Sequence, residues 1–377
     1  MIDRSEAWVS QVERGVRRID RMTVLRQVAE VLEVPLAELA ADTPVVAAAS
    51  SRSATATGLR MLVSSSLALS LAAAERMPES VESVDLAALR SGADQAWELA
   101  HATGYEQLVP LVVELLPKTE TAVRVGSADQ RVAACQVLAR IYHACAAALV
   151  KLGELPAAWV CADRAIAAAE RAGDLLLMAE GAFRLTVVFQ FARQYDQATA
   201  TAGTAAAALA PLVEQGQLAA VSLRGALRLQ LAVTAARQNE AEQAYAYLDA
   251  ARGDAERLGG DRNDYHTEFG PTNVTLHRVG VAVELGDAGA ALRAAAGVDA
   301  SALSPERQGR LFIDVARAQM QRRNGEATIA ALMNAERVAP EQTRRHWITR
   351  NLLQDLDHAG HGRDARVRDL TERCRTA

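Results

Sequence analysis

The chain has 377 residues, of which 50% are hydrophobic, 4% are aromatic and only 10 are proline. Basic residues number 41 and acidic residues 46, so the net charge of −5 excludes a uniformly basic, nucleic-acid-coating protein. Any contact with DNA must be local, and residues 1–26, with six arginines against four acidic residues, are the candidate. Alanine is abundant, as are Leu, Glu, Gln and Arg, and these residues favour helix over strand. The composition therefore predicts an all-α protein.

The first predicted helices lie at the N-terminus. Ser5 is a suitable N-cap for a helix over residues 6–14, and Gly15 supplies its left-handed end. A second helix is predicted over residues 22–33, because its apolar residues recur at the spacing of one helical face: Leu25, Val28, Ala29 and Leu32. Pro35 opens a short third helix.

The composition changes after these helices. Residues 41–57 are rich in Ala, Ser and Thr and have no regular period, so we predict a linker there. Residues 59–74 form the most apolar stretch, but serines interrupt it and it is shorter than the ~20 residues of a membrane span. We interpret it as a buried amphipathic helix, which leaves no predicted contact with a membrane.

Five later segments share a pattern of a helix, a short polar turn and a second helix with a small residue near its start. The turns, each written with the Ala that follows, are GELPAA (153–158), RQYDQA (193–198), NEAEQA (239–244), GDAGAA (286–291) and GEATIA (325–330). An earlier, looser unit is GYEQLV (104–109). Two antiparallel helices approach closely only where no bulky side chain intervenes. The alanines therefore predict repeated helix pairs.

The N-terminal segment resembles part of a lambda-repressor-like (XRE-type) helix-turn-helix domain. The resemblance rests on WVSQVERG (8–15), which matches the recognition helix, and on LRQVAEVLEVPLAEL (25–39), which matches its hydrophobic support. It implies a DNA-binding domain over residues 1–40 that reads the major groove. It also implies that the first two helices of that domain are missing, since Met1 falls at the turn before the recognition helix. The residues expected to contact DNA are Ser5, Glu6, Ala7, Ser10, Gln11, Arg14, Arg17 and Arg18.

The repeated turn resembles that of tetratricopeptide repeats, although its spacing exceeds the ~34 residues usual in that family. By this resemblance residues 58–377 form an α-solenoid of tetratricopeptide-like helix pairs, which serves as a sensor and dimerisation domain. XRE-type regulators with such a domain include some that sense small peptides. The resemblance thus implies a homodimeric transcriptional regulator in which a peptide or small-molecule effector changes DNA binding.

Candidate ligand-binding residues are polar side chains on the first helices of two units. Asn273 and His277 are four residues apart and share a helical face, where an amide can both donate to and accept from a peptide backbone. Arg184 and Gln190, beside two phenylalanines, form a second candidate wall. Each pair also fits a structural role, because Asn273 could cap a helix and the other pair could lie in the core between repeats.

The sequence contains no Gly-rich phosphate loop, metal-ligand spacing or nucleophile motif, so it predicts neither an enzyme nor a cofactor. The four cysteines lack CxxC spacing, and the N-terminus carries charges where a secretory signal would be apolar. Both features predict a cytoplasmic protein with reduced thiols. The alternative to a regulator is a protein–protein interaction scaffold with a vestigial N-terminus that does not bind DNA.

Overall fold

The computed structural model describes residues 6–13, 28, 31–32, 54–64 and 85–376. Most of these residues are helical and none lies in a strand, although one isolated bridge joins Arg262 and Phe269. The prediction of an all-α protein is therefore confirmed. The helices are α1 (Glu6–Glu13), α4 (Ala54–Ser64), α6 (Leu86–His101), α7 (Tyr105–Val125), α8 (Ala128–Lys151), α9 (Leu155–Arg171), α10 (Leu175–Phe191), α11 (Tyr195–Ala208), α12 (Ala210–Glu214), α13 (Leu218–Gln238), α14 (Ala241–Leu258), η1 (Asp264–His266), α15 (Pro271–Glu284), α16 (Ala288–Ala295), α17 (Pro305–Gln321), α18 (Gly325–Val338), α19 (Pro340–Arg345), α20 (Trp347–Leu356), η2 (Asp357–His361) and α21 (Ala365–Thr376).

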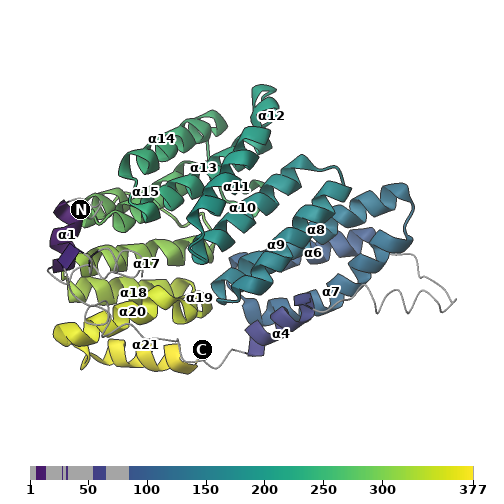
Figure 1. Ribbon diagram of the computed structural model, residues 1–377. Coiled ribbons are helices and arrows are strands. Elements are labelled where there is room, and N and C mark those ends of the chain that lie inside the picture. The colour runs from purple at the N-terminus through teal and green to yellow at the C-terminus, as the bar shows by residue number, and fades with distance from the viewer. Residues whose placement is uncertain (1–5, 14–27, 29–30, 33–53, 65–84, 377) are drawn as a thin grey trace.

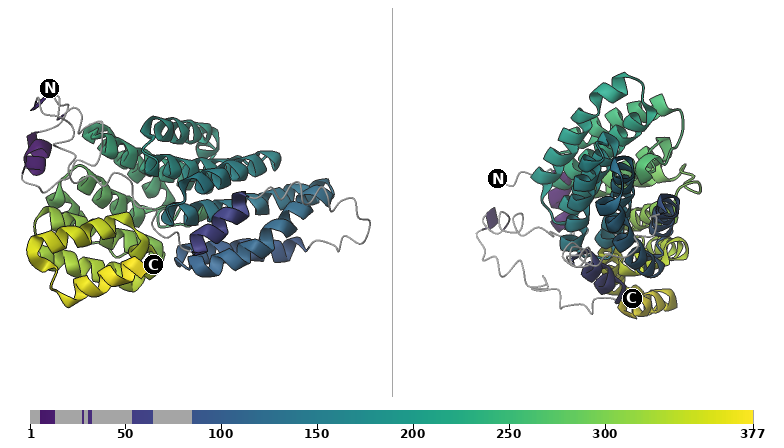
Figure 2. Two further views of the ribbon diagram at one scale, coloured as in Figure 1. Left: turned by 60° about the horizontal axis from the view of Figure 1, so that its bottom comes forward. Right: turned by 90° about the vertical axis from the view of Figure 1, so that its right-hand side faces the viewer.

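Consecutive helices pack as pairs that short turns join (Figure 1). The pairs are α6 with α7, α8 with α9, α10 with α11, α13 with α14, α15 with α16, and α17 with α18. The first helix of each pair also packs against the first helix of the next pair. We call the surface shared by these six first helices the inner face. Two further views show the stack running from α6–α9 at one end to α17–α21 at the other (Figure 2).

The turns of the five repeated segments share one backbone geometry, which explains their common pattern. Each begins with a residue in the left-handed region, at φ between 58° and 84°: Gly153, Arg193, Asn239, Gly286 and Arg323. The next residue is the N-cap of the second helix. The position five after the left-handed residue then faces the partner helix. We call these five contact positions the pair seam.

Four of the five predicted seam alanines are fully buried: Ala158, Ala198, Ala244 and Ala291. The fifth prediction is wrong, because Ala330 is exposed. Gly325 is already the first residue of α18, and the left-handed residue of this turn is Arg323. The seam position is therefore Thr328, which is fully buried. The alignment on a glycine rather than on the N-cap Asn324 displaced the prediction by two residues.

The N-terminal predictions are only partly within the described residues. The first predicted helix is present as α1, and Val28, Val31 and Leu32 are helical where the second was expected. α4 begins at Ala54 and packs against α7 and α9, so the last four residues of the predicted linker are helical instead. The rest of that linker and the predicted third helix lie outside the described residues.

Two helices, α8 and α13, are long and apolar enough to cross a membrane by length and composition. In each of these helices, 72% of the most apolar 18-residue segment is buried inside the protein. Both are first helices of their pairs, and neighbouring helices pack on them from several sides. Burial within the helix stack therefore accounts for their hydropathy.

Candidate ligand-binding cavity

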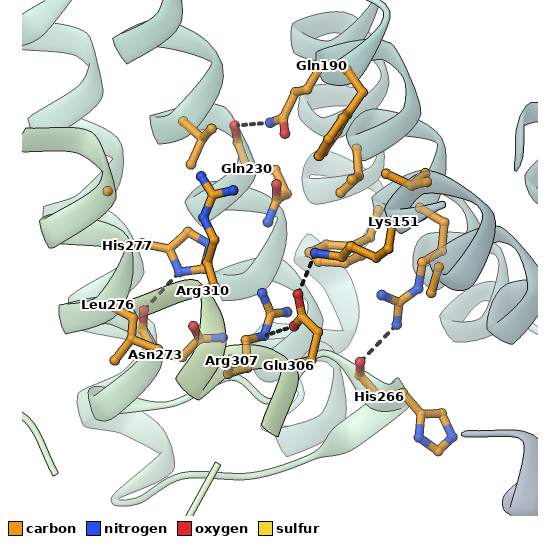
Figure 3. Close-up of a pocket in the computed structure, with 18 of the residues that line it drawn as sticks. Lys151, Gln190, Gln230, His266, Asn273, Leu276, His277, Glu306, Arg307 and Arg310 are labelled. Carbon is orange, nitrogen blue, oxygen red and sulfur yellow. Dashed lines mark hydrogen bonds and ion pairs between the residues drawn. The ribbon is translucent and has the colours of Figure 1, made fainter. Parts of the chain in front are cut away.

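A cavity of about 140 Å³ lies on the inner face (Figure 3). All six first helices contribute residues to its wall, together with Tyr105 at the start of α7 and His266 in η1. The two ends of the stack meet across it, because Lys151 at the end of α8 forms an ion pair with Glu306 at the start of α17. A cavity of this kind is possible because the first helices curve around a common space.

The four predicted ligand-binding residues all lie in the wall of this cavity, although they come from helices far apart in sequence. Arg184 and Gln190 stand on α10, and Asn273 and His277 stand on α15. The structure therefore brings together two sets of residues that the sequence could only treat separately. Whether they bind a ligand depends on which of their polar atoms remain available.

The Asn273 side chain already has a structural role. It is 2% exposed, and its Nδ2 donates to the backbone oxygens of Glu268 at 2.8 Å and Thr267 at 3.4 Å. Its Oδ1 is buried without a hydrogen-bond partner among the described residues. One half of the amide thus holds the preceding loop, and the other half remains an acceptor at the cavity.

His277 lies one helical turn after Asn273 and shares its hydrogen-bond environment. Its Nδ1 is 2.9 Å from the backbone oxygen of Asn273. Burial, reinforced by the nearby charge of Arg307, lowers the pKa of His277 to about 4. The imidazole is therefore neutral at neutral pH, and it donates through Nδ1 to the Asn273 carbonyl.

Gln190 and Arg184 are also mostly engaged. The Nε2 of Gln190 donates to the backbone oxygen of Gln230 at 2.9 Å and to Thr234 Oγ1 at 3.0 Å. Arg184 donates to the His266 oxygen at 2.9 Å, and its guanidinium lies 4.6 Å from the ring centroid of Trp97. Burial lowers the pKa of Arg184 to about 10, so it stays charged at neutral pH. Its Nε has no hydrogen-bond partner among the described residues.

The loop over residues 260–270, which we call the strap, closes one end of the cavity. Three of its residues other than glycine have left-handed φ values: Tyr265 at 51°, His266 at 55° and Glu268 at 50°. Such conformations cost of order 1 kcal/mol or more each and persist only where the surroundings enforce them. The His266 ring stacks on Trp97 with centroids 4.2 Å apart, and the Phe269 ring packs against Gly225 of α13. These contacts hold the strap across the inner face.

A cluster of charged residues on the cavity wall was not predicted. Glu306 lies between Lys151 and Arg307 and forms ion pairs with both. The Nε of Arg310 lies 3.1 Å from Oδ2 of Asp314. Burial opposes ionisation of Glu306, but the charges of Lys151 and Arg307 outweigh it and hold the pKa of that carboxyl well below its usual range. In the sequence, charged residues three and four positions apart, as on α17, indicate a helical face that is exposed to solvent. In the structure these residues of α17 line the cavity instead.

The predicted DNA-binding residues are only partly visible. Ser5, Arg14, Arg17 and Arg18 lie outside the described residues, as do the side chains of Glu6 and Ala7. Trp8 of α1 is 6% exposed, and Ser10 and Gln11 are half-buried. The Nε2 of Gln11, which we expected to face a base, donates to the Gly286 oxygen at 2.6 Å. In this structure Gln11 therefore binds the helical body.

No protein-family model matches the chain, and no curated protein is significantly similar to it. Within the described residues, no group of three His, Cys, Asp or Glu side chains is placed to hold a metal ion. The four cysteines are buried free thiols.

Proposed function

We propose that the chain is a transcriptional regulator that responds to an effector. In this proposal the helix pairs form a tetratricopeptide-like α-solenoid, whose inner face binds a peptide or small molecule. Residues 1–40 form the helix-turn-helix head that contacts DNA. The protein acts as a cytoplasmic homodimer, and we assign it no catalytic activity, cofactor or membrane contact.

The contact between α1 and the end of α15 gives this proposal its main support. α15 carries Asn273 and His277 on the cavity wall and ends at Glu284. Two residues later, the Gly286 oxygen accepts the hydrogen bond from Gln11. α15 and the turn that follows it thus connect the cavity to the segment that resembles a recognition helix.

This geometry suggests how an effector would act. A ligand that shifts the equilibrium position of α15 also changes the surface on which α1 rests. If the docked and released positions of α1 differ in DNA affinity, the ligand and DNA are coupled through that one helix, and the coupling must be reciprocal. The docked arrangement, in which the Gln11 amide is occupied, is the form with the weaker DNA contact.

In vitro selection from a random duplex pool tests the proposal. We expect the full chain to enrich a site with two related half-sites, because a homodimer matches a two-fold operator. Affinity should fall steeply as salt rises, and Arg14→Ala and Arg17→Ala should each weaken binding to all sequences about equally. Failure to enrich any site at low salt would refute DNA binding by this chain.

The alternative function, an interaction scaffold without DNA binding, is supported by the same contact. A buried Trp8 and an engaged Gln11 are what a purely structural end-piece would show. The two functions differ in what Gln11→Ala does. In a regulator the variant releases α1 and changes DNA affinity, whereas in a scaffold it changes only stability.

A further inference from the structure

The cavity wall carries an excess of positive charge. Five cations line it against three carboxylates: Lys151, Arg184, Arg237, Arg307 and Arg310 against Glu284, Glu306 and Asp314. Glu180 and Glu268 pair with wall arginines from behind, and Arg317 pairs with Glu284 and Asp314. With these outer groups included, six cations still face five carboxylates. A bound anion would complete the charge balance of a partly desolvated site.

Several polar atoms in the wall lack a hydrogen-bond partner among the described residues. Two of them belong to N–H groups that can only donate, Trp97 Nε1 and Arg184 Nε, and two are the imidazole nitrogens His101 Nε2 and His266 Nδ1. The Tyr105 hydroxyl, 1% exposed, is likewise unpartnered. Of the wall's oxygens, only Asn273 Oδ1 is an unpartnered acceptor in the described part of the chain. Buried donors without partners are costly, so Trp97 Nε1 and Arg184 Nε favour a ligand that carries acceptor oxygens.

Apolar side chains form the rest of the wall. Trp97, Phe183 and Phe191 contribute aromatic surface, and Val187, Val233 and Leu276 contribute aliphatic surface. Lys151 and Arg307 flank Glu306 near the start of α17 (Figure 3). Arg184 lies against the Trp97 and Phe183 rings, and Arg237 lies near the Phe191 ring. The wall therefore combines cationic and apolar surface, as expected for a site that binds an amphipathic small ligand.

The volume limits the size of what is enclosed. One enclosed water needs roughly 10–15 Å³ on the same measure, so about 140 Å³ holds on the order of ten non-hydrogen atoms. The cavity is open to solvent, since the Lys151 and Arg310 side chains remain 19% and 22% exposed. A longer ligand would have to extend through this opening.

We propose that the cavity binds a small organic anion, whose carboxylate or phosphate is held by Lys151, Arg307 and Arg310 and whose apolar body packs against the half-buried Val187, Phe191 and Val233. This inference rests on the proposed function and specifies the effector of that same site. It replaces a peptide by a molecule of roughly amino-acid size. The anion takes up donors of Arg307 and Lys151 that Glu306 now shares.

Calorimetric titration of the full chain with three probes of similar size tests this inference. The probes are 3-phenylpropanoate, phenyl phosphate and the neutral 3-phenylpropanamide. We expect one of the two anions to bind at least about ten-fold more tightly than the amide, the difference typical of one charge-assisted hydrogen bond. The preferred anion identifies the source of the negative charge as carboxylate or phosphate.

Substitutions place the binding at the cavity. Arg307→Gln leaves Glu306 paired with Lys151, and Arg310→Gln leaves Asp314 paired with Arg317. Each should fold normally and weaken anion binding about ten-fold or more, without changing the affinity for the amide. Arg252→Gln, on the exposed side of α14, is the matched control and should change neither affinity. Circular dichroism of each variant checks that it has folded.

Several outcomes would overturn the inference. It fails if the amide binds as tightly as both anions, if none of the probes binds, or if Arg252→Gln weakens binding as much as Arg307→Gln. A tetrapeptide with a free carboxylate that binds where the small anions do not would also overturn it, but would leave the proposed regulator intact. The in vitro selection of DNA sites uses none of the small-molecule probes. It would therefore detect a failure of the proposed function independently of the calorimetric titration.

Discussion

The pair seam and the inner face are built on opposite principles. The seam is formed by small side chains, such as Ala158 and Ala244, which are fully buried and leave nothing polar to satisfy. The inner face buries Arg184, Glu306 and Asn273, and several polar atoms there have no hydrogen-bond partner in the described part of the chain. Small apolar residues are sufficient to bring two helices together. Burying charged side chains costs desolvation energy and adds little to stability. Their concentration on the inner face therefore indicates a function rather than a contribution to stability.

Overpacking the seam should produce the largest effect. Ala158→Leu inserts three carbon atoms at a fully buried crossing, and we expect a loss of about 3 kcal/mol in the free energy of unfolding. Ala330→Leu, at the exposed position that sequence alone had placed in the seam, should change it by less than about 0.5 kcal/mol. Urea denaturation measures both. Similar losses for the two variants would show that the seam register is wrong.

Displacing the strap should have a smaller effect on stability but a clear effect on the inner face. A Cβ on Gly225 would lie 2.0 Å from a ring carbon of Phe269, so Gly225→Ala must push the strap away from α13. We expect a loss of about 2 kcal/mol on urea denaturation. Quenching of the Trp97 fluorescence by acrylamide, measured with Trp8, Trp159 and Trp347 replaced by Phe, should increase, because His266 no longer covers that ring. Unchanged quenching would mean that the strap does not depend on the Phe269 contact.

Acid sensitivity should belong to the inner face. The folded-state pKa of His277 is about 4, below its unfolded value near 6.5, so the unfolded chain binds the proton first as pH falls. The stability from neutral His277 is complete above pH 6.5 and is lost between pH 6.5 and about 4, with a slope of up to about 1.4 kcal/mol per pH unit. Urea midpoints at pH 7.5, 5.5 and 4.5 should therefore fall less steeply in His277→Gln than in the wild type. Parallel curves would exclude His277 as a contributor.

The smallest expected effect comes from the turns that begin the second helices. Gly153 has φ 78° and no atom within 4 Å of an added Cβ, so Gly153→Ala tests backbone strain alone. We expect it to cost about 1 kcal/mol. Gly253→Ala, in the middle of α14 and equally unobstructed, should instead stabilise by up to about 1 kcal/mol. Thermal unfolding of the two variants should move in opposite directions, and a shared direction would contradict the role given to the turn.

The sequence predicted the features that depend on local chemistry. An all-α chain, four of five seam alanines and the four polar residues of the cavity wall follow from periodicity and residue type. The fifth turn was missed because Asn324 caps α18 directly before Gly325, and glycine is the stronger turn signal in a sequence. The Lys151–Glu306 pair joins residues 155 positions apart, and no local pattern reports such a contact. The strap was missed because its left-handed residues, Tyr265 and Glu268, are not ones that usually adopt that conformation.

Amide hydrogen exchange of the full chain tests the central claim most directly, namely that the inner face communicates with α1 through α15. The exchange of residues 6–13 is measured with and without a saturating concentration of the tightest-binding probe. We predict that α15 becomes more protected and that α1 changes its protection at the same time, while α21, which packs on α18, α19 and α20, remains unchanged. Protection of α15 with no change in α1 would contradict the coupling and favour an interaction scaffold.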